Sequence, residues 1–200
     1  MSKGKLRYYY GTMSSLKTGT LLTKVHQFEQ SGCNTILLKP SFDTRDDGII
    51  KSRAICEGRP CVTFDKDANV FEIVKSLIVK NVKTVVFVDE VNFITPEQVK
   101  QLWQVTRKLG SVDVFTYGLK TNYLNELFES SKQLLIMADT VEEIKSMCSY
   151  CHNKATTHLR YVNDKPTFVG EVCIVGDVTG TEYYKSVCQD CWHKEFEKGE

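Results

Sequence analysis

The residues with the most distinctive chemistry are Lys17 and Thr18, which close a short loop after the largely aromatic run 6–10. The apolar spacing after Lys17 is helical, so the order is strand, loop, Lys-Thr, helix. In a phosphate-binding loop of this order, backbone N–H groups face the anion, the lysine reaches the β- and γ-phosphates and the threonine holds Mg²⁺. The usual pattern, G-x-x-x-x-G-K-S/T, has its second glycine where this chain has Leu16. An ordinary strand–turn–helix with a surface lysine therefore remains an alternative.

Two neighbouring acids, Asp89 and Glu90, follow the β-branched, apolar run 83–88. A carboxylate at the carboxyl end of a strand can bind Mg²⁺, and the residue after it is placed to act as a base. Ligands of open parallel sheets bind at this edge, so the phosphate loop and the acids are expected to meet in one crevice. Taken alone, the two acids are better explained as an ordinary polar end of a strand. Their combination with Lys17 and Thr18 favours the functional interpretation.

Two Cys-x-x-Cys pairs lie in the last third of the chain. Cys148 with Cys151 and Cys188 with Cys191 supply four thiolates, the ligand set of a structural Zn²⁺, across 36 intervening residues. Three alternatives remain: haem attachment at the Cys-x-x-Cys-His run 148–152, a redox Cys-x-x-Cys, and His152 or His193 as a replacement ligand. The other four cysteines are expected to be small buried residues: Cys33, Cys56, Cys61 and Cys173.

The elements that must position these groups alternate along the chain. Strands are expected at 6–10, 34–39, 61–64, 83–88 and 112–117, and helices from residue 17, at 70–78 and from Thr95-Pro96 to about Leu109. This order predicts an α/β fold, a parallel sheet flanked by helices. The polar stretch 41–59 has little periodicity, and we expect it to be mobile or functional. The rhythm changes near Thr140, which predicts a nucleotide-binding domain at 1–145 and a small metal-binding domain at 146–200.

Size and charge exclude several classes of protein. The 200 residues are 42% hydrophobic, which is enough for a buried core. The formal net charge of +1 is much lower than the positive charge typical of proteins that bind nucleic acid. The amino terminus does not resemble a signal peptide, and no run approaches the length of a membrane span. We therefore expect a soluble, cytoplasmic protein that acts neither on nucleic acid nor at a membrane.

Taken together, the motifs resemble those of the type II thymidine kinases. The resemblance covers nearly the whole chain in the family's order, and its motifs are the loop 11–18, Lys39-Pro40 with Asp43-Thr44-Arg45, the run 87–93, Tyr117-Gly118-Leu119 and the two cysteine pairs. It implies a P-loop NTPase-type sheet with a zinc-binding lasso domain. It also implies transfer of the ATP γ-phosphoryl group to the 5′-hydroxyl of thymidine or deoxyuridine, with Mg²⁺. The family is usually a homotetramer inhibited by its end product, dTTP.

The resemblance also implies a role for individual residues. Glu90 would be the general base, Thr18 and Asp89 would serve Mg²⁺, and the segment between the cysteine pairs would be a lasso that closes over the base. The ATP-binding set would be Gly11, Thr12, Met13, Ser14, Ser15, Leu16, Lys17, Thr18, Asp43, Arg45 and Asp89. The thymidine-binding set would be Met13, Leu119, Tyr123, Phe128, Glu182 and Tyr184, with main-chain groups of Val178, Thr179 and Gly180, for which residues 175–177 are an alternative.

Leu16 is the main departure from the family pattern. A positive φ at this position would cost a leucine on the order of 1–3 kcal/mol. We expect an active kinase, because the other chemical groups are present. The alternatives are a weakened kinase, a P-loop ATPase whose zinc domain recruits a partner, and a module that binds nucleotide or nucleic acid without turnover.

Overall fold

A six-stranded parallel sheet forms the body of the protein. In the computed structural model, residues 3–41, 48–52, 55–170 and 182–198 are described. The sheet has the strand order β5-β2-β6-β7-β1-β8, and every neighbouring pair is parallel. Its strands are β1 (Leu6–Gly11), β2 (Asn34–Pro40), β5 (Val62–Phe64), β6 (Thr84–Val88), β7 (Asp113–Gly118) and β8 (Thr140–Ile144).

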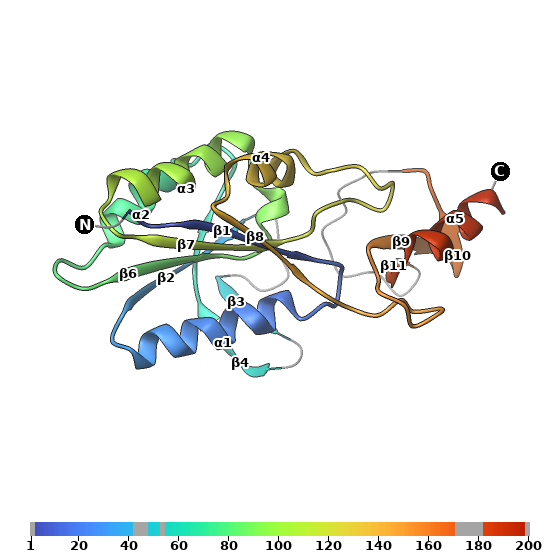
Figure 1. The fold of residues 1–200 in the computed structure, drawn as a ribbon, viewed down its shortest axis with the longest axis horizontal. Coiled ribbons are helices and arrows are strands. Elements are labelled where there is room, and N and C mark those ends of the chain that lie inside the picture. Colours follow the sequence, from blue (N-terminus) through green and yellow to red (C-terminus); the bar gives the residue numbers. More distant parts are fainter. Residues whose placement is uncertain (1–2, 42–47, 53–54, 171–181, 199–200) are drawn as a thin grey trace.

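Helices cover both faces of this sheet, as Figure 1 shows. One face carries α1 (Lys17–Gln30), and the other carries α2 (Val70–Leu77), α3 (Pro96–Lys108) and α4 (Glu129–Met137). A separate hydrophobic core lies on each face, because successive side chains of β1 point to opposite sides of the sheet. Leu6 and Tyr8 pack with α2, α3 and α4, whereas Tyr9 packs with α1. The central strands are apolar on both sides because both sides are buried.

Local signals start the helices where the sequence predicted them. Thr95 and Gln98 form a reciprocal capping box at the start of α3, with Pro96 as the first helical residue. Asn69 caps α2 by accepting a hydrogen bond from the Glu72 N–H group. These helices therefore begin at positions that side chains specify locally.

A second, antiparallel sheet lies beyond the carboxyl ends of the parallel strands (Figure 1). Its order is β10-β9-β11, with β9 at Thr157–Val162, β10 at Lys165–Thr167 and β11 at Glu182–Val187. Helix α5 (Gln189–Glu197) follows, and a small core with Leu159, Val187 and Trp192 joins helix to sheet. This unit contains both Cys-x-x-Cys pairs.

Most predicted elements are confirmed, but the sequence did not predict secondary structure in the stretch 41–59. Its described residues include most of an antiparallel hairpin, β3 (Ile49–Ser52) and β4 (Ile55–Pro60). The missed signal is a short alternation in which Ile50 is buried against α1 while Ile49 is exposed. Sequence reasoning also missed α4 and β8. β8 is an exposed edge strand, so its residues lack the apolar pattern of the central strands.

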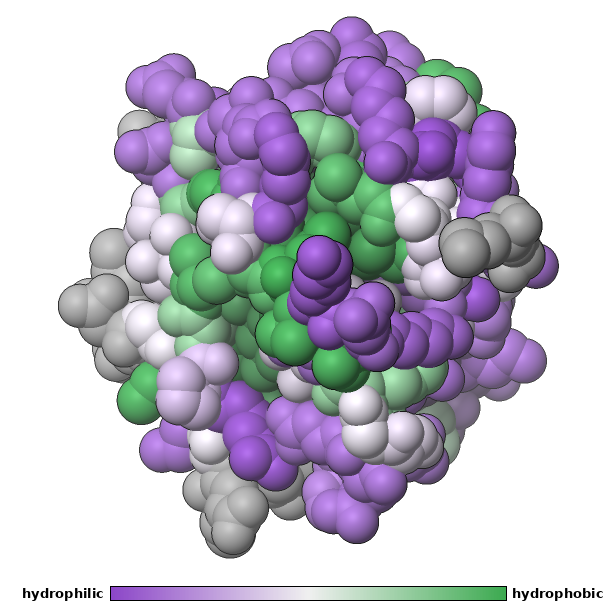
Figure 2. Space-filling view, turned by 90° about the vertical axis from the view of Figure 1, so that its left-hand side faces the viewer, coloured by the Kyte–Doolittle hydropathy of each residue, from purple (hydrophilic) through white to green (hydrophobic). Residues whose placement is uncertain are grey.

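Apolar side chains are exposed at the end of the parallel sheet where its strands begin, opposite the end that faces the second sheet. Figure 2 views the molecule at the amino ends of the strands and shows apolar surface framed by hydrophilic residues. The segment joining α2 to β6 lies at this end (Figure 1), and in it Val79 and Val82 are 47% and 38% exposed. This surface is far from the carboxyl edge, where the candidate catalytic residues lie.

Candidate active site

β1 leads directly into the predicted phosphate loop. Gly11 is the last residue of the strand, and α1 begins at Lys17. A Cβ atom at Gly11 would lie 2.6 Å from the main-chain oxygen of Ile144 and 2.4 Å from Ser15 Oγ. Because the backbone approaches so closely, only glycine fits at the entrance to the loop. The predicted sequence of strand, loop and helix is confirmed.

The amino end of α1 is open to an anion. Within the described part of the chain no side chain caps this end, and its first turn contains no acid. Lys17 is buried and its Nζ atom donates to the Thr12 carbonyl oxygen at 2.7 Å. The Ser15 hydroxyl is buried without a hydrogen-bond partner among the described residues. The first N–H groups of a helix have no intrahelical partner, so they join the lysine and the hydroxyl as donors for a phosphate.

Leu16 adopts the left-handed conformation, with φ 64° and ψ 27°. Ser14 does the same, with φ 58°. This conformation costs a non-glycine residue roughly 1–2 kcal/mol. The Leu16 side chain is 60% exposed, so its packing offsets little of that cost. The condition under which the sequence predicted a penalty, a positive φ at Leu16, is therefore met.

Thr18 and Asp89 bring the loop and the acids together. Thr18 Oγ1 donates to Asp89 Oδ2 at 3.0 Å, although β7 separates β1 from β6 in the sheet. The contact forms because the three parallel strands end at the same edge. Burial raises the pKa of Asp89, and the adjacent Glu90 carboxylate raises it further. A bound divalent cation would relieve both effects, because it favours the charged carboxylate.

The acidic turn, residues 89–93, is held in an unusual conformation. Glu90 is half-buried and has φ 51°, and its N–H group donates to Asp89 Oδ1 at 3.1 Å. The short 3₁₀ helix η1 (Val91–Phe93) follows. Asn92, inside it, accepts the Leu119 N–H group on Oδ1 at 2.9 Å. The turn is thus tied to the segment that follows β7.

The residues predicted to contact thymine fall into two groups. Leu119 and Phe128 lie beside the acidic turn. The Leu119 N–H group donates to Asn92, and the Phe128 ring packs edge-to-face on Phe93 with ring centroids 6.2 Å apart. Tyr123 instead lies against the second sheet, where it is 2% exposed and donates its hydroxyl hydrogen to the Gly170 carbonyl at 3.0 Å. The phosphate-loop candidate, Met13, is half-buried.

The predicted lasso residues are only partly described. Glu182 accepts from Arg160 Nε at 2.6 Å, and Tyr184 lies opposite Arg160 in the β9–β11 ladder. The Arg160 guanidinium also lies 5.5 Å from the centre of the Tyr123 ring. The remaining predicted residues, Asp43, Arg45, Val178, Thr179, Gly180 and the alternative 175–177, lie outside the described residues.

Four cysteines form a candidate metal centre. The Sγ atoms of Cys148, Cys151, Cys188 and Cys191 all lie within 4.8 Å of one another. Although burial acts to raise the pKa of the Cys148 thiol, the surrounding main-chain N–H groups outweigh it and hold the pKa below its usual value. Four sulfurs gathered this closely, one of them inclined to ionise, suit the tetrahedral thiolate set that Zn²⁺ takes.

Sequence reasoning missed three residues of the C-terminal part that contact the phosphate loop. Ser146 forms a hydroxyl–hydroxyl hydrogen bond with Thr12. His158 and Ser186 bond to the main chain of Met13. A single sequence contains no signal for these contacts, because they join residues more than 130 positions apart.

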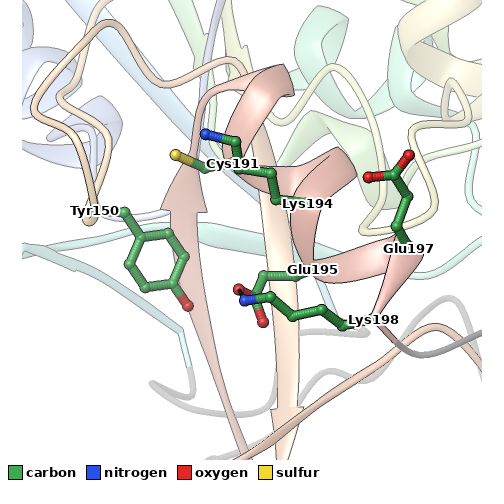
Figure 3. A pocket seen from close by; sticks show the side chains of 6 residues that line it. All are labelled: Tyr150, Cys191, Lys194, Glu195, Glu197 and Lys198. Carbon is green, nitrogen blue, oxygen red and sulfur yellow. Dashed lines mark hydrogen bonds and ion pairs between the residues drawn. The ribbon is translucent and has the colours of Figure 1, made fainter.

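A hollow of about 430 Å³ lies beside the metal centre, lined by Tyr150, Cys191, Lys194, Glu195, Glu197 and Lys198 (Figure 3). Its charged side chains come from α5 and from Lys198, which follows the helix and pairs with Glu195 at 2.5 Å. Neither the residues of the predicted phosphate loop nor Asp89 and Glu90 line it. The hollow is therefore separate from the candidate catalytic groups.

Comparison with known proteins identifies the family. The family model described as thymidine kinase matches residues 4–192. The chain belongs to the thymidine kinase family. Two similar relatives are the thymidine kinases of Streptococcus agalactiae serotype Ia and Streptococcus pyogenes serotype M3, each 38% identical over 186 residues. In both cases the alignment covers 92% of this chain and 95% of the relative.

A likeness among solved structures supports the fold alone. The ATPase domain of G40P superposes with a TM-score of 0.51 at 12% identity, over 80% of this chain and 77% of the other. The described parallel sheet, with its phosphate loop after β1, is thus of the P-loop NTPase type. Among the described helices, none combines the length and apolarity needed to cross a lipid bilayer.

Replacement of Leu16 by glycine is expected to relieve strain in the phosphate loop. Because glycine adopts positive φ freely, Leu16→Gly should raise the free energy of unfolding by about 0.5–1.5 kcal/mol in urea titrations. Leu16→Ala is the matched control, since it removes the exposed side chain but keeps the Cβ atom and therefore the strain. Equal stability of the two variants would contradict this account of Leu16.

The buried imidazole of His158 predicts a specific pH dependence of stability. Burial, with a smaller contribution from the Lys17 ammonium, lowers the pKa of His158 to about 3. The unfolded chain then binds more protons than the folded one, so this group destabilises the fold as the pH falls through its unfolded pKa of about 6.5. Between pH 7 and 5.5, His158→Gln should therefore lose about 1 kcal/mol less stability than the unmodified chain.

The measurement is the free energy of unfolding at the two pH values. His26→Gln is the control for the loss of an imidazole, because His26 is exposed on α1. If His158→Gln and the unmodified chain lose the same stability over this range, His158 is not buried in its neutral form.

Proposed function

We propose that this chain transfers the γ-phosphoryl group of ATP to the 5′-hydroxyl of thymidine or deoxyuridine. The observation that carries the proposal is the contact between Thr18 Oγ1 and Asp89 Oδ2, which joins a lysine-bearing phosphate loop to a pair of acids. Membership of the thymidine kinase family and the names of its relatives support the choice of substrate.

The phosphate end of the site would act by positioning and by charge. Lys17 would exchange the Thr12 carbonyl for the β- and γ-phosphates, and the amides of residues 14–18 would cradle them. Thr18 and Asp89 offer the oxygen ligands that Mg²⁺ prefers, and the raised pKa of Asp89 fits a carboxylate in need of a cation. Bound Mg²⁺ supplies charge neutralisation at the phosphates. Asp43 and Arg45 would complete this end of the site.

Glu90 would take the proton of the 5′-hydroxyl group. The 5′-oxygen forms a bond to the γ-phosphorus, the bond from that phosphorus to the bridging oxygen breaks, and ADP leaves as the proton passes to the Glu90 carboxylate. The positive φ of Glu90 turns its main chain away from the direction of β6 immediately after Asp89. The two neighbouring carboxylates can therefore take separate roles.

The thymine ring would lie between the two sheets. Met13, Leu119 and Phe128 would supply the apolar wall beside the acidic turn, and Tyr123 would close it on the side of the second sheet. Glu182 and Tyr184, from the lasso, would contribute to the thymidine site. Glu182 accepts a hydrogen bond from Arg160, and Tyr184 lies opposite Arg160 in the β9–β11 ladder. Main-chain groups of Val178, Thr179 and Gly180 would hydrogen-bond the edge of the base.

Zn²⁺ would occupy the four-cysteine centre as a structural ion. It would join the loop before β9 to the start of α5 and so close the long segment between the two cysteine pairs. By the same resemblance to the family, we propose that the active form is a homotetramer and that dTTP inhibits it.

The main alternative is a nucleotide-binding protein with weakened or lost turnover. The left-handed conformation of Leu16 favours it, because the strain falls in the loop that must hold the phosphates. An assay of ADP formation with Mg²⁺, ATP and each deoxynucleoside separates the two functions. Thymidine-dependent ADP formation supports the kinase, whereas ATP binding without it supports the alternative.

Removal of the Glu90 carboxylate is expected to abolish catalysis and preserve binding. Glu90→Gln should lower kcat by roughly 10²–10⁴-fold, because that is the usual contribution of a general base. The dissociation constant of thymidine should change little. Glu97→Gln is the control, since Glu97 is an exposed acid of α3. A rate for Glu90→Gln close to that of the control would exclude Glu90 as the base.

Loss of one thiolate should release the metal. Cys188→Ser is expected to lower bound zinc from about one ion per chain to none and to lower the melting temperature, because metal binding is coupled to folding of the second sheet. Cys33→Ser removes a cysteine outside the cluster and should retain the ion. Elemental analysis of both variants decides the matter, and full zinc content in Cys188→Ser would rule out the proposed site.

A further inference from the structure

Two side chains of the second sheet hold both polar main-chain groups of Met13. The Met13 N–H group donates to His158 Nε2 at 2.8 Å, and Ser186 Oγ donates to the Met13 carbonyl oxygen at 2.7 Å. His158 on β9 and Ser186 on β11 are directly opposite each other in the antiparallel ladder, so their side chains share one face. This pair, the Met13 clamp, thus contacts the phosphate loop from outside the parallel sheet.

His158 is suited to accept the Met13 hydrogen bond at every neutral pH, because its imidazole stays uncharged. Its side chain is 3% exposed, and the Lys17 ammonium nearby disfavours a second positive charge. A neutral imidazole with its proton on Nδ1 leaves Nε2 free to accept the Met13 N–H group, whereas an imidazolium would have no acceptor. The bond therefore persists throughout the neutral pH range.

The phosphate loop of this chain has a particular need for such support. Ser14 and Leu16, which flank Ser15 just after Met13, both adopt left-handed conformations without being glycine. Strained residues persist only where the surrounding structure imposes their conformation. The clamp fixes the chain one residue before the first of them, and the Thr12–Ser146 hydrogen bond fixes it one residue earlier.

The clamp is also attached to the metal centre. Ser186 lies two residues before Cys188, and its carbonyl oxygen accepts the Ser149 N–H group at 2.9 Å, within the first cysteine pair. On the opposite face of β11, the Lys185 ammonium lies 4.8–5.7 Å from the ring centres of Tyr150, Tyr161 and Tyr183. These contacts join β11 to β9 and to the loop of the first cysteine pair, and Ser186 contacts Met13 from this joined strand.

We infer that His158 and Ser186 are positioning residues that hold the strained phosphate loop in its anion-binding conformation. The inference rests on the proposed function in that the bound anion is the phosphate chain of ATP. Loss of the clamp should weaken ATP binding, and the loss should be smaller when glycine replaces Leu16, because a loop with less strain needs less support.

The test combines the clamp with Leu16. His158→Phe keeps a ring but removes the acceptor, and His158→Gln restores an acceptor at similar reach. Ser186→Ala deletes a single hydroxyl group, so it tests the clamp without a large change in packing. We expect His158→Phe and Ser186→Ala to raise the KM for ATP about 3–10-fold with a smaller effect on kcat, since each removes one hydrogen bond. His158→Gln should remain within about twofold of the unmodified chain.

The double variant Leu16→Gly/His158→Phe supplies the decisive comparison. Relative to Leu16→Gly alone, its KM for ATP should rise less than His158→Phe raises it in the unmodified chain. A purely structural role of His158 would give equal rises, and this result would overturn the inference, as would equal KM values for His158→Phe and the unmodified chain. His26→Phe, on the exposed face of α1, controls for the exchange of an imidazole for a phenyl ring.

A second readout does not depend on kinase activity. The dissociation constant of a fluorescent ATP analogue and the hydrogen exchange rate of the Met13 amide can be measured even without thymidine turnover. Faster exchange and weaker nucleotide binding in Ser186→Ala support the clamp. Unchanged exchange in both His158→Phe and Ser186→Ala contradicts it. Absence of thymidine phosphorylation in the unmodified chain, by contrast, contradicts the proposed function alone.

Discussion

The hydrogen bond from Thr18 to Asp89 joins the two halves of the candidate catalytic centre. It exists because parallel strands end at the same edge, so a helix that starts after β1 can meet an acid that ends β6, even across β7. The open amino end of α1, the Lys17 ammonium and the buried carboxylate all converge there. A displacement of either strand would separate the groups that phosphoryl transfer requires to be close.

The second sheet completes this arrangement from the other side. It contacts the predicted phosphate loop through His158 and Ser186, and it contacts the Tyr123 ring through Arg160. Two residues outside its strands add to these contacts, because Ser146 bonds to Thr12 and the Gly170 carbonyl accepts from Tyr123. These contacts explain how a loop with leucine in place of glycine keeps its shape. The conformational cost at Leu16 is local, and the restraints that oppose it come from residues far away in the sequence.

Much of the fold was predictable because its signals are local. Apolar runs marked the central strands, and Thr95-Pro96 marked the start of α3. The edge strand β8 and the β3–β4 hairpin escaped because short, half-exposed strands lack a continuous apolar pattern. For the site, Lys17, Thr18, Asp89 and the four cysteines were recognisable from type and spacing. His158 and Ser186 were not, because only the β9–β11 register brings them to Met13.

A crystal structure with thymidine, Mg²⁺ and a non-hydrolysable ATP analogue would show whether the phosphate loop and the two acids form one catalytic centre. We expect Lys17 Nζ to leave the Thr12 carbonyl for the β- and γ-phosphates, and Mg²⁺ to lie beside Thr18 and Asp89 with the 5′-hydroxyl within hydrogen-bond reach of Glu90. Phosphates bound elsewhere, with Lys17 still on Thr12, would contradict this arrangement.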